Sequence, residues 1–124
     1  MIAKNPRHQF AHGLLGEILI LKGDPAGAEA EFRLATGLKP EWSTPWVNWV
    51  TLKLSQRKGE EANEILQHGL QVNPKNEELR LLYASHLGDR GQFDLAITEY
   101  ETILSQNPRD LMAANNLAAI LTDQ

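Results

Sequence analysis

Apolar residues return at three- and four-residue steps along most of the chain, the spacing of one face of an α-helix. Turn residues interrupt this pattern: Gly23 suits a helix C-terminus, Asp24 an N-cap and Pro25 the first helical position. Strand patterns are absent from the sequence. The pattern predicts about seven helices, roughly at residues 9–22, 25–38, 44–57, 60–72, 77–89, 93–106 and 110–122.

Two of the predicted helix ends carry a specific expectation. Ser43 or Thr44 is expected to cap the third helix, because short hydroxyl side chains accept hydrogen bonds from the first turn. Gly59 lies two residues later than the spacing of Gly23 and Gly91 requires. We therefore expect the second turn to have a different shape from the first and third.

The predicted helices fall into repeats of 34 residues, because Pro6, Pro40, Pro74 and Pro108 are each 34 positions apart. Two further columns keep the step: Ala28, Ala62 and Ala96, and the large apolar Phe32, Leu66 and Tyr100. Small residues let antiparallel helices approach closely, and one hairpin cannot bury its apolar face alone. The period therefore predicts an all-α stack of helix hairpins.

The period also predicts the organisation of the chain as a single array. Its parts would be the end of a preceding repeat at 1–8, repeats at 9–42, 43–76 and 77–110, and the first helix of a fourth at 111–124. This last helix carries Leu117, Ile120 and Leu121 without a partner, whereas solenoids normally end in a polar capping helix. We expect a fragment of a longer protein, or self-association through this helix.

Composition excludes several classes of function. Among the 124 residues there is no cysteine, so disulfides and thiolate metal sites are ruled out. The formal net charge of −4 does not favour general binding of nucleic acid. No apolar run reaches the length of a membrane span and no secretory signal opens the chain, so we expect a soluble protein of the cytoplasm or periplasm. Phosphate-loop, nucleophile-elbow and zinc-protease motifs are missing, and we expect no enzyme, cofactor or metal.

The spaced residues resemble the tetratricopeptide repeat (TPR) family, whose 34-residue motif carries W, L-G, Y, A, F, A and P at fixed offsets. Trp46 fills the W slot of the second repeat, and Leu15 with Gly16 fills the L-G slots of the first. Ala28, Ala62 and Ala96 fill the next A slot. Phe32 and Tyr100 fill the F slot, and the four prolines fill the final P slot. Residues 114–118 (Ala-Asn-Asn-Leu-Ala) resemble the start of a family helix, and their pattern is similar to that of bacterial members.

This resemblance implies a right-handed α-solenoid of antiparallel hairpins that binds a partner protein in a concave groove. Of the twenty groove-facing slots, four are acidic (Glu17, Glu78, Asp89 and Asp123) and none is lysine or arginine. We therefore expect an apolar and possibly basic partner segment. The residues expected to contact it are Phe10, Glu17, Val47, Asn48, Thr51, Glu78, Leu81, Ser85, Asp89, Met112, Asn115 and Asn116.

The resemblance also argues against one class of partner. Chaperone-binding members of the family hold a terminal carboxylate with lysine, asparagine and arginine. The matching slots here hold Gly13, Glu17, Glu78 and Leu82. We expect no binding of partners that end in an acidic motif. The alternatives to a binding module are an architectural segment and the regulatory arm of an enzyme whose catalytic domain lies elsewhere.

Asn48 and Asn116 occupy slots where some TPR superhelices carry an asparagine ladder that grips a peptide backbone. An amide side chain can both donate and accept, which suits this role. The alternative is that both residues cap or bridge neighbouring helices.

Three other groups of residues are expected to have a structural role or to be solvated, without a role in binding. Trp46 and Trp49 are expected in the core, and Trp42 is expected to pack over a turn. The histidines, His8, His12, His68 and His86, are expected to be ordinary surface or inter-helix residues instead of metal ligands. Lys53, Arg57 and Lys58 are expected to form a solvated basic turn, with phosphate binding as the alternative.

Overall fold

The computed structural model describes residues 8–123, with side chains described for 10–122. It comprises two compact units, which divide after Pro74. The first unit holds α1 (His8–Leu21), α2 (Pro25–Leu38), α3 (Ser43–Ser55) and α4 (Gly59–Val72). The second holds α5 (Glu77–Asp89), α6 (Phe93–Gln106) and α7 (Leu111–Asp123). No strand occurs within the described range, which confirms the all-α prediction.

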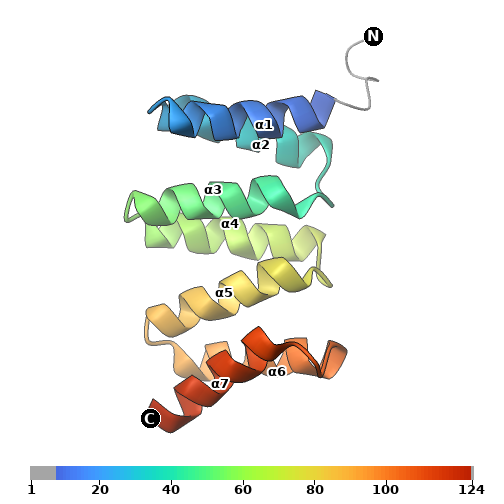
Figure 1. Ribbon diagram of the computed structural model, residues 1–124, viewed down its shortest axis with the longest axis vertical. Helices are drawn as coiled ribbons and strands as arrows, with labels where there is room; N and C mark the ends of the chain where they lie inside the picture. The colour runs from blue at the N-terminus through green and yellow to red at the C-terminus, as the bar shows by residue number, and fades with distance from the viewer. Residues whose placement is uncertain (1–7, 124) are drawn as a thin grey trace. The chain divides into compact units, whose positions relative to one another are not determined.

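Within each unit, consecutive helices pack side by side as antiparallel hairpins (Figure 1). In the first unit α1 packs on α2 and α3 packs on α4, while α3 also contacts α1 and α2. In the second unit α6 lies against both α5 and α7. Prolines stand two residues beyond the ends of α2, α4 and α6, where their missing N–H prevents the helix from continuing.

The turns inside the three hairpins have the same shape, so the expectation of a different second turn was wrong. Arg57 takes a left-handed backbone with φ of 60°, as Gly23 and Gly91 do with φ of 78° and 76°. Each turn closes with a hydrogen bond from the next residue to the carbonyl five positions back, for example 2.9 Å from Lys58 N to Lys53 O. Gly59 instead begins α4.

The caps follow the sequence in some places and depart from it in one. Asp24 accepts a hydrogen bond of 3.0 Å from Gly27 N, and Pro25 opens α2, as predicted. For α3 the prediction of a Ser43 or Thr44 cap was wrong, because Ser43 is already helical and Trp42 occupies the cap position without a side-chain hydrogen bond. Asp110 precedes α7 and accepts a hydrogen bond of 3.0 Å from Ala113 N, and this bond lowers the pKa of its carboxyl.

Close helix contacts depend on glycine at two places in the first unit. A Cβ on Gly16 would lie 2.6 Å from Cε1 of the fully buried Phe32, so only glycine lets α1 approach α2 there. A Cβ on Gly13 would lie 2.7 Å from the ring of Trp42. Phe10 meets the same indole edge-on, with ring centroids 4.7 Å apart, so the Trp42 ring packs against α1.

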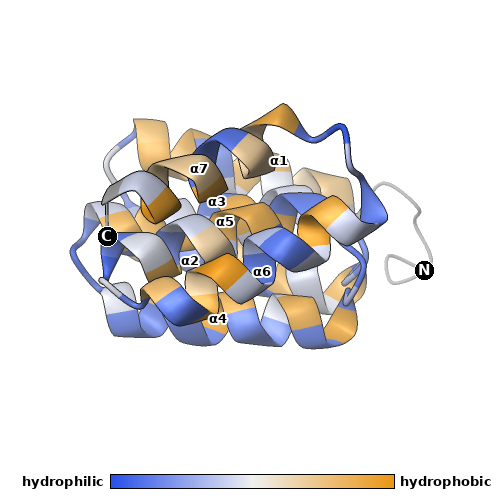
Figure 2. Cartoon of the chain, turned by 90° about the horizontal axis from the view of Figure 1, so that it is seen from below, coloured by the Kyte–Doolittle hydropathy of each residue, from blue (hydrophilic) through white to orange (hydrophobic). Residues whose placement is uncertain are grey.

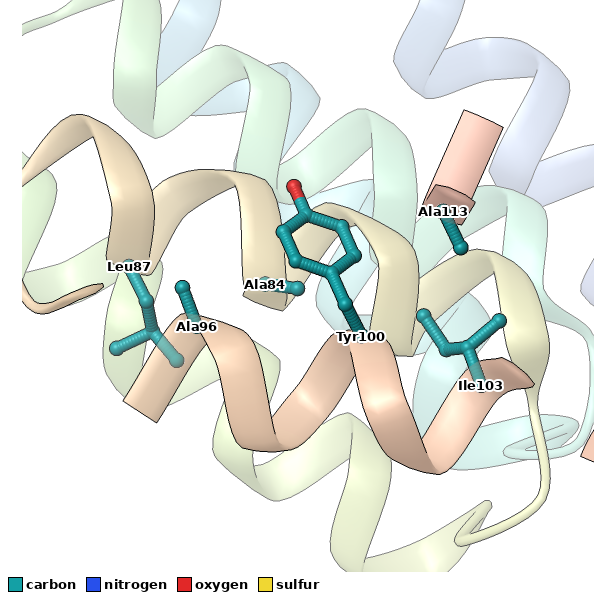
Figure 3. Packing of buried hydrophobic residues seen from close by; sticks show 6 residues of the cluster. All are labelled: Ala84, Leu87, Ala96, Tyr100, Ile103 and Ala113. Carbon is teal, nitrogen blue, oxygen red and sulfur yellow. The ribbon is translucent and has the colours of Figure 1, made fainter. Parts of the chain in front are cut away.

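The core of the second unit is built by all three of its helices. Figure 3 shows the ring of Tyr100 extending from α6 between Ala84 of α5 and Ala113 of α7. Leu87, Ala96 and Ile103 complete this buried cluster. The small alanines let the helices approach, and the tyrosine fills the space between them. Tyr100 therefore reaches from the second helix of its hairpin to the side formed by α5 and α7.

Candidate functional site

A hollow of about 370 Å³, called hollow 1 below, opens between α1 and α3 of the first unit. On each helix the lining residues follow the first one at three, four or seven positions, so they share one helix face. They are Glu17, Ile20 and Leu21 of α1, and Asn48, Thr51, Leu52 and Ser55 of α3.

The chemistry of hollow 1 is an apolar surface with a few polar groups. Leu52 is buried, whereas Ile20 and Leu21 are exposed. The Thr51 hydroxyl donates 2.8 Å to the carbonyl of Val47, and the Ser55 hydroxyl donates in the same way to its own helix. Because these donors are already used, the Glu17 carboxylate and the Asn48 amide are the polar groups left for a ligand.

A second hollow of about 300 Å³, called hollow 2, lies within the second unit. All three of its helices contribute to the lining. The lining residues are Ser85, Gly88 and Asp89 of α5, Phe93 and Tyr100 of α6, and Asn116, Ala119 and Ile120 of α7.

The Tyr100 hydroxyl organises the polar part of hollow 2. It hydrogen-bonds to the side chains of Asn116 and Ser85. Burial raises the pKa of the Tyr100 phenol, which outweighs the opposing effect of these two hydrogen bonds, and the negative charge of Asp89 adds to the increase. Tyr100 therefore stays protonated and links α6 to both α5 and α7.

The two hollows are built from the same slots two repeats apart, because the lining positions differ by 68, twice the period of 34. The matched pairs are Glu17 and Ser85, Ile20 and Gly88, Leu21 and Asp89, Asn48 and Asn116, Thr51 and Ala119, and Leu52 and Ile120. The asparagine is common to both. The chemistry differs where α5 places Gly88 and Asp89 in the slots of two large aliphatic residues.

The structure brings half of the predicted contact residues into the hollows. Glu17, Asn48 and Thr51 line hollow 1, and Ser85, Asp89 and Asn116 line hollow 2. The other predicted residues lie outside both linings: Phe10, Val47, Glu78, Leu81, Met112 and Asn115. Phe10 is covered in part by Trp42 and by the Lys39 ammonium, 4.9 Å from its ring centroid.

Sequence reasoning missed the aromatic residues of hollow 2. Tyr100 and Phe93 lie on α6, the second helix of their hairpin, whereas the predicted contacts were all placed on first helices. The signal in the sequence was Gly88, which is the smallest possible residue in a slot that is large in the first repeat. Without a side chain there, residues from the neighbouring helix can reach the surface.

Trp46 and Trp49 are core residues, as predicted. Trp46 is 2% exposed and Trp49 is 9% exposed, and their rings stack with centroids 6.1 Å apart. Both indole N–H groups have partners, since Trp46 donates 2.8 Å to the carbonyl of Pro40 and Trp49 donates 3.0 Å to Glu29. These bonds satisfy the donors that burial would otherwise leave unpaired.

The expectation of a solvated basic turn was wrong for Lys53. This side chain is 4% exposed, and its ammonium lies 2.9 Å from Glu29 Oε2 and 2.8 Å from Glu61 Oε1. It joins α3 to α2 and α4 within the first unit. Arg57 and Lys58 are exposed as expected.

The histidines whose side chains are described are surface or inter-helix residues, as expected. His12 pairs with Glu31 of α2, and His68 meets Trp46 edge-on at 5.3 Å. His86 is buried, and the side chain of His8 lies outside the described residues. No group of three or more potential metal ligands gathers among the described side chains.

None of the described helices has both the length and the apolar content needed to cross a bilayer.

Comparison with known structures supports the fold. The first TPR domain of human RPAP3 superposes with a TM-score of 0.76 at 15% identity, covering 95% of this chain and 93% of that domain. The second TPR domain of human RPAP3, solved in complex with the HSP70 peptide SGPTIEEVD, superposes with a TM-score of 0.74 at 17% identity, covering 94% of this chain and 98% of that domain. At these identities the similarity concerns the fold alone.

Comparison of sequences supports the family. A curated relative is the BBSome complex member BBS4 of Bos taurus, 30% identical over 97 residues. The match covers 78% of this chain but 19% of the relative, so the chain spans about a fifth of that protein. The profile described as tetratricopeptide repeat matches residues 53–121, more than half of the chain. Seven helices in the described range, the 34-residue period and this match lead to one conclusion: the chain belongs to the tetratricopeptide repeat family.

Proposed function

We propose that the chain is a non-catalytic protein-interaction module, and that the hollow of each unit binds part of an extended or helical partner. One observation carries this proposal. Both hollows combine apolar side chains with one carboxylate and one asparagine, and they use equivalent slots. An apolar surface with a few placed polar groups is the usual composition of a site that binds a ligand.

We further propose that the partner segment is apolar and basic. Glu17 in hollow 1 and Asp89 in hollow 2 form no ion pair with any side chain in the described range. No lysine or arginine lines either hollow. A partner cation would therefore gain a favourable interaction in each hollow, and a partner carboxylate would be repelled.

The peptides bound by similar TPR domains differ in charge from the partner segment proposed for this chain. The first TPR domain of Spaghetti is bound to the HSP90 peptide SRMEEVD, and a human RPAP3 domain is in complex with SGPTIEEVD. Both peptides are acidic near their end. This chain carries Glu17 and Glu78 in two slots where clamps for such ends place basic or amide side chains, so we propose that its preference is reversed.

The experiment is a titration with matched peptides. Two peptides share one apolar framework and differ only in lysines replaced by glutamates, and their affinities are compared by fluorescence anisotropy at low salt. The basic peptide is expected to bind more tightly, and added salt is expected to narrow the difference. Equal affinity for both peptides would overturn the proposal.

The repeat limits 9–42, 43–76, 77–110 and 111–124 belong to this proposal. Their support is the identical bonding of the three intra-hairpin turns. The alternative that the chain is the regulatory arm of an enzyme whose catalytic domain lies elsewhere stays a prediction.

A second candidate function is architectural, with α7 as a self-assembly surface. Hydrophobic residues recur along α7 (Figure 2), and the exposed fractions of Leu111, Met112 and Leu121 are 73%, 63% and 55%. Sedimentation of the wild type against Leu121→Asp tests this role. If both are monomers at high concentration, the assembly role fails.

A further inference from the structure

Asp89 is the one acidic residue in the lining of hollow 2. Asp89 is the last residue of α5, and helix C-termini carry partial negative charge. Its carboxylate makes no ion pair with the side chains that the structure describes. Asp89 is exposed and lines the hollow together with Tyr100.

The walls beside Asp89 are apolar and aromatic. Phe93 is 42% exposed, and Ala119 and Ile120 line the opposite side from α7. Gly88 leaves space between them, since a Cβ built there would meet only Ile120 Cδ1 at 3.6 Å. An aliphatic stem can lie along such walls while its charged head remains near the carboxylate.

Hollow 1 lacks this combination, although it uses the same slots. Ile20 and Leu21 occupy the positions of Gly88 and Asp89, so aliphatic side chains fill the space and no charge stands at that end. The carboxylate of hollow 1, Glu17, is one turn earlier on its helix. The two hollows therefore differ in which side chain they fit.

We propose that hollow 2 is a subsite for a single lysine or arginine side chain of the partner. The stem packs against Phe93 and Ile120, and the cation lies at Asp89 within reach of the aromatic rings. The subsite rests on the proposed function and deepens it, because it names the side chain that this hollow accepts.

A capped amino acid tests the subsite without knowledge of the partner. The ¹⁵N-labelled protein is titrated with N-acetyl-lysine N-methylamide, with the arginine analogue as a second arm. The norleucine and glutamate analogues serve as uncharged and acidic comparisons. The lysine or arginine compound is expected to shift the amide signals of Ser85, Gly88 and Asn116 in a saturable way, several-fold more tightly than norleucine. Equal shifts with norleucine, or shifts spread over the whole chain, would overturn the subsite.

Two variants locate the effect. Asp89→Asn is expected to weaken binding of the lysine compound about three- to fivefold, the range of an exposed ion pair. Gly88→Leu fills the space and is expected to abolish binding of the lysine compound. Far-UV circular dichroism of this variant shows whether the helices are retained. Glu101→Gln is the matched control, because it removes one exposed carboxylate from α6 outside the lining. An equal loss in Glu101→Gln and Asp89→Asn would overturn the assignment to Asp89.

The subsite and the proposed function can fail separately. If the basic peptide outbinds the acidic one but the lysine compound leaves hollow 2 unchanged, the subsite is wrong and the module stands. If the lysine compound binds in hollow 2 but neither peptide binds, the subsite stands and the proposed function is wrong.

Discussion

Lys53 Nζ lies 2.9 Å from Oε2 of Glu29, and this ion pair joins α3 to α2 inside the first unit. The ammonium also lies 2.8 Å from Glu61 Oε1. The family motif usually places an aromatic residue at the slot of Lys53. Here a long basic side chain fills that space, and two carboxylates satisfy its charge.

Removal of the lysine is expected to destabilise the protein. Lys53→Ala deletes a buried stem and leaves the half-buried Glu29 without its main cation, at a cost of about 2 kcal/mol. Lys53→Met keeps the volume and should cost less. Urea unfolding measures both, and the exposed Lys58→Ala is the control. If Lys53→Ala and Lys58→Ala unfold at the same urea concentration, the pair contributes nothing.

The same cluster predicts a pH dependence. For Glu29, burial alone would raise the pKa, but hydrogen bonds from Lys53 and Trp49 outweigh it and hold the pKa below 4.5. The hydrogen bond from Lys53 also lowers the pKa of Glu61. Because these folded-state values lie below the unfolded ones, their contribution is present above about pH 4.5 and is lost as pH falls through the folded pKa values.

The lysine acts in the opposite sense. Burial alone would lower the pKa of Lys53, but its hydrogen bonds to Glu61 and Glu29 raise it above 10.5. Its contribution is therefore present below pH 10.5 and is lost as pH rises through the folded pKa. Urea midpoints of the wild type and Lys53→Met, measured across pH, should differ most near neutrality and converge at both extremes. A constant difference at all pH values would contradict this account.

Arg57 predicts a stabilising substitution. Its backbone is left-handed with φ of 60°, a conformation that costs an ordinary residue about 1 kcal/mol and costs glycine little. Arg57→Gly is expected to raise the free energy of unfolding by a value approaching 1 kcal/mol. Arg57→Ala keeps the Cβ and should give no such gain, so a gain shared equally by both variants would point to the side chain instead.

Two glycines of the first hairpin should respond to alanine in opposite ways. Gly16→Ala places a Cβ 2.6 Å from the Phe32 ring and is expected to cost about 2 kcal/mol. Gly37 is helical, and a Cβ there would meet nothing within 4 Å, so Gly37→Ala should stabilise by about 0.5 kcal/mol. Thermal unfolding of both variants is the measurement. The double variant with Phe32→Leu should recover part of the loss in Gly16→Ala, and no recovery would mean that another contact is responsible.

The two asparagines should separate in their effects. Asn116 hydrogen-bonds to the Tyr100 hydroxyl, so Asn116→Ala is expected to lower stability by about 1 kcal/mol. No hydrogen bond of the Asn48 side chain is found within the described residues, although that side chain lines hollow 1. Asn48→Ala is expected to leave the unfolding temperature unchanged and to weaken the basic peptide. The ladder role of Asn48 would be contradicted if peptide affinity stayed the same.

The helices could be predicted closely because their signals are local. Apolar spacing, Gly23, Asp24 and the repeated prolines act within a few residues of the backbone they shape. The predicted difference in shape of the second turn was wrong, because the hairpin packing imposes on Arg57 a left-handed backbone that an ordinary residue does not favour. Glu17, Asn48 and Asp89, which were expected from the family slots, line the hollows, and their contact with a partner stays a prediction.

The sequence by itself determined the class of fold, the period and the Asp24 cap of α2, since each depends on the order of residues along one or two helices. Only the tertiary structure decided that Lys53 is buried between two glutamates and that Tyr100 and Phe93 of α6 line hollow 2. These features arise where side chains from three helices converge, and their neighbours in space are 8 to 24 positions away along the chain for Lys53. Such distances leave no trace in local spacing, because burial and charge pairing depend on which faces the packing brings together.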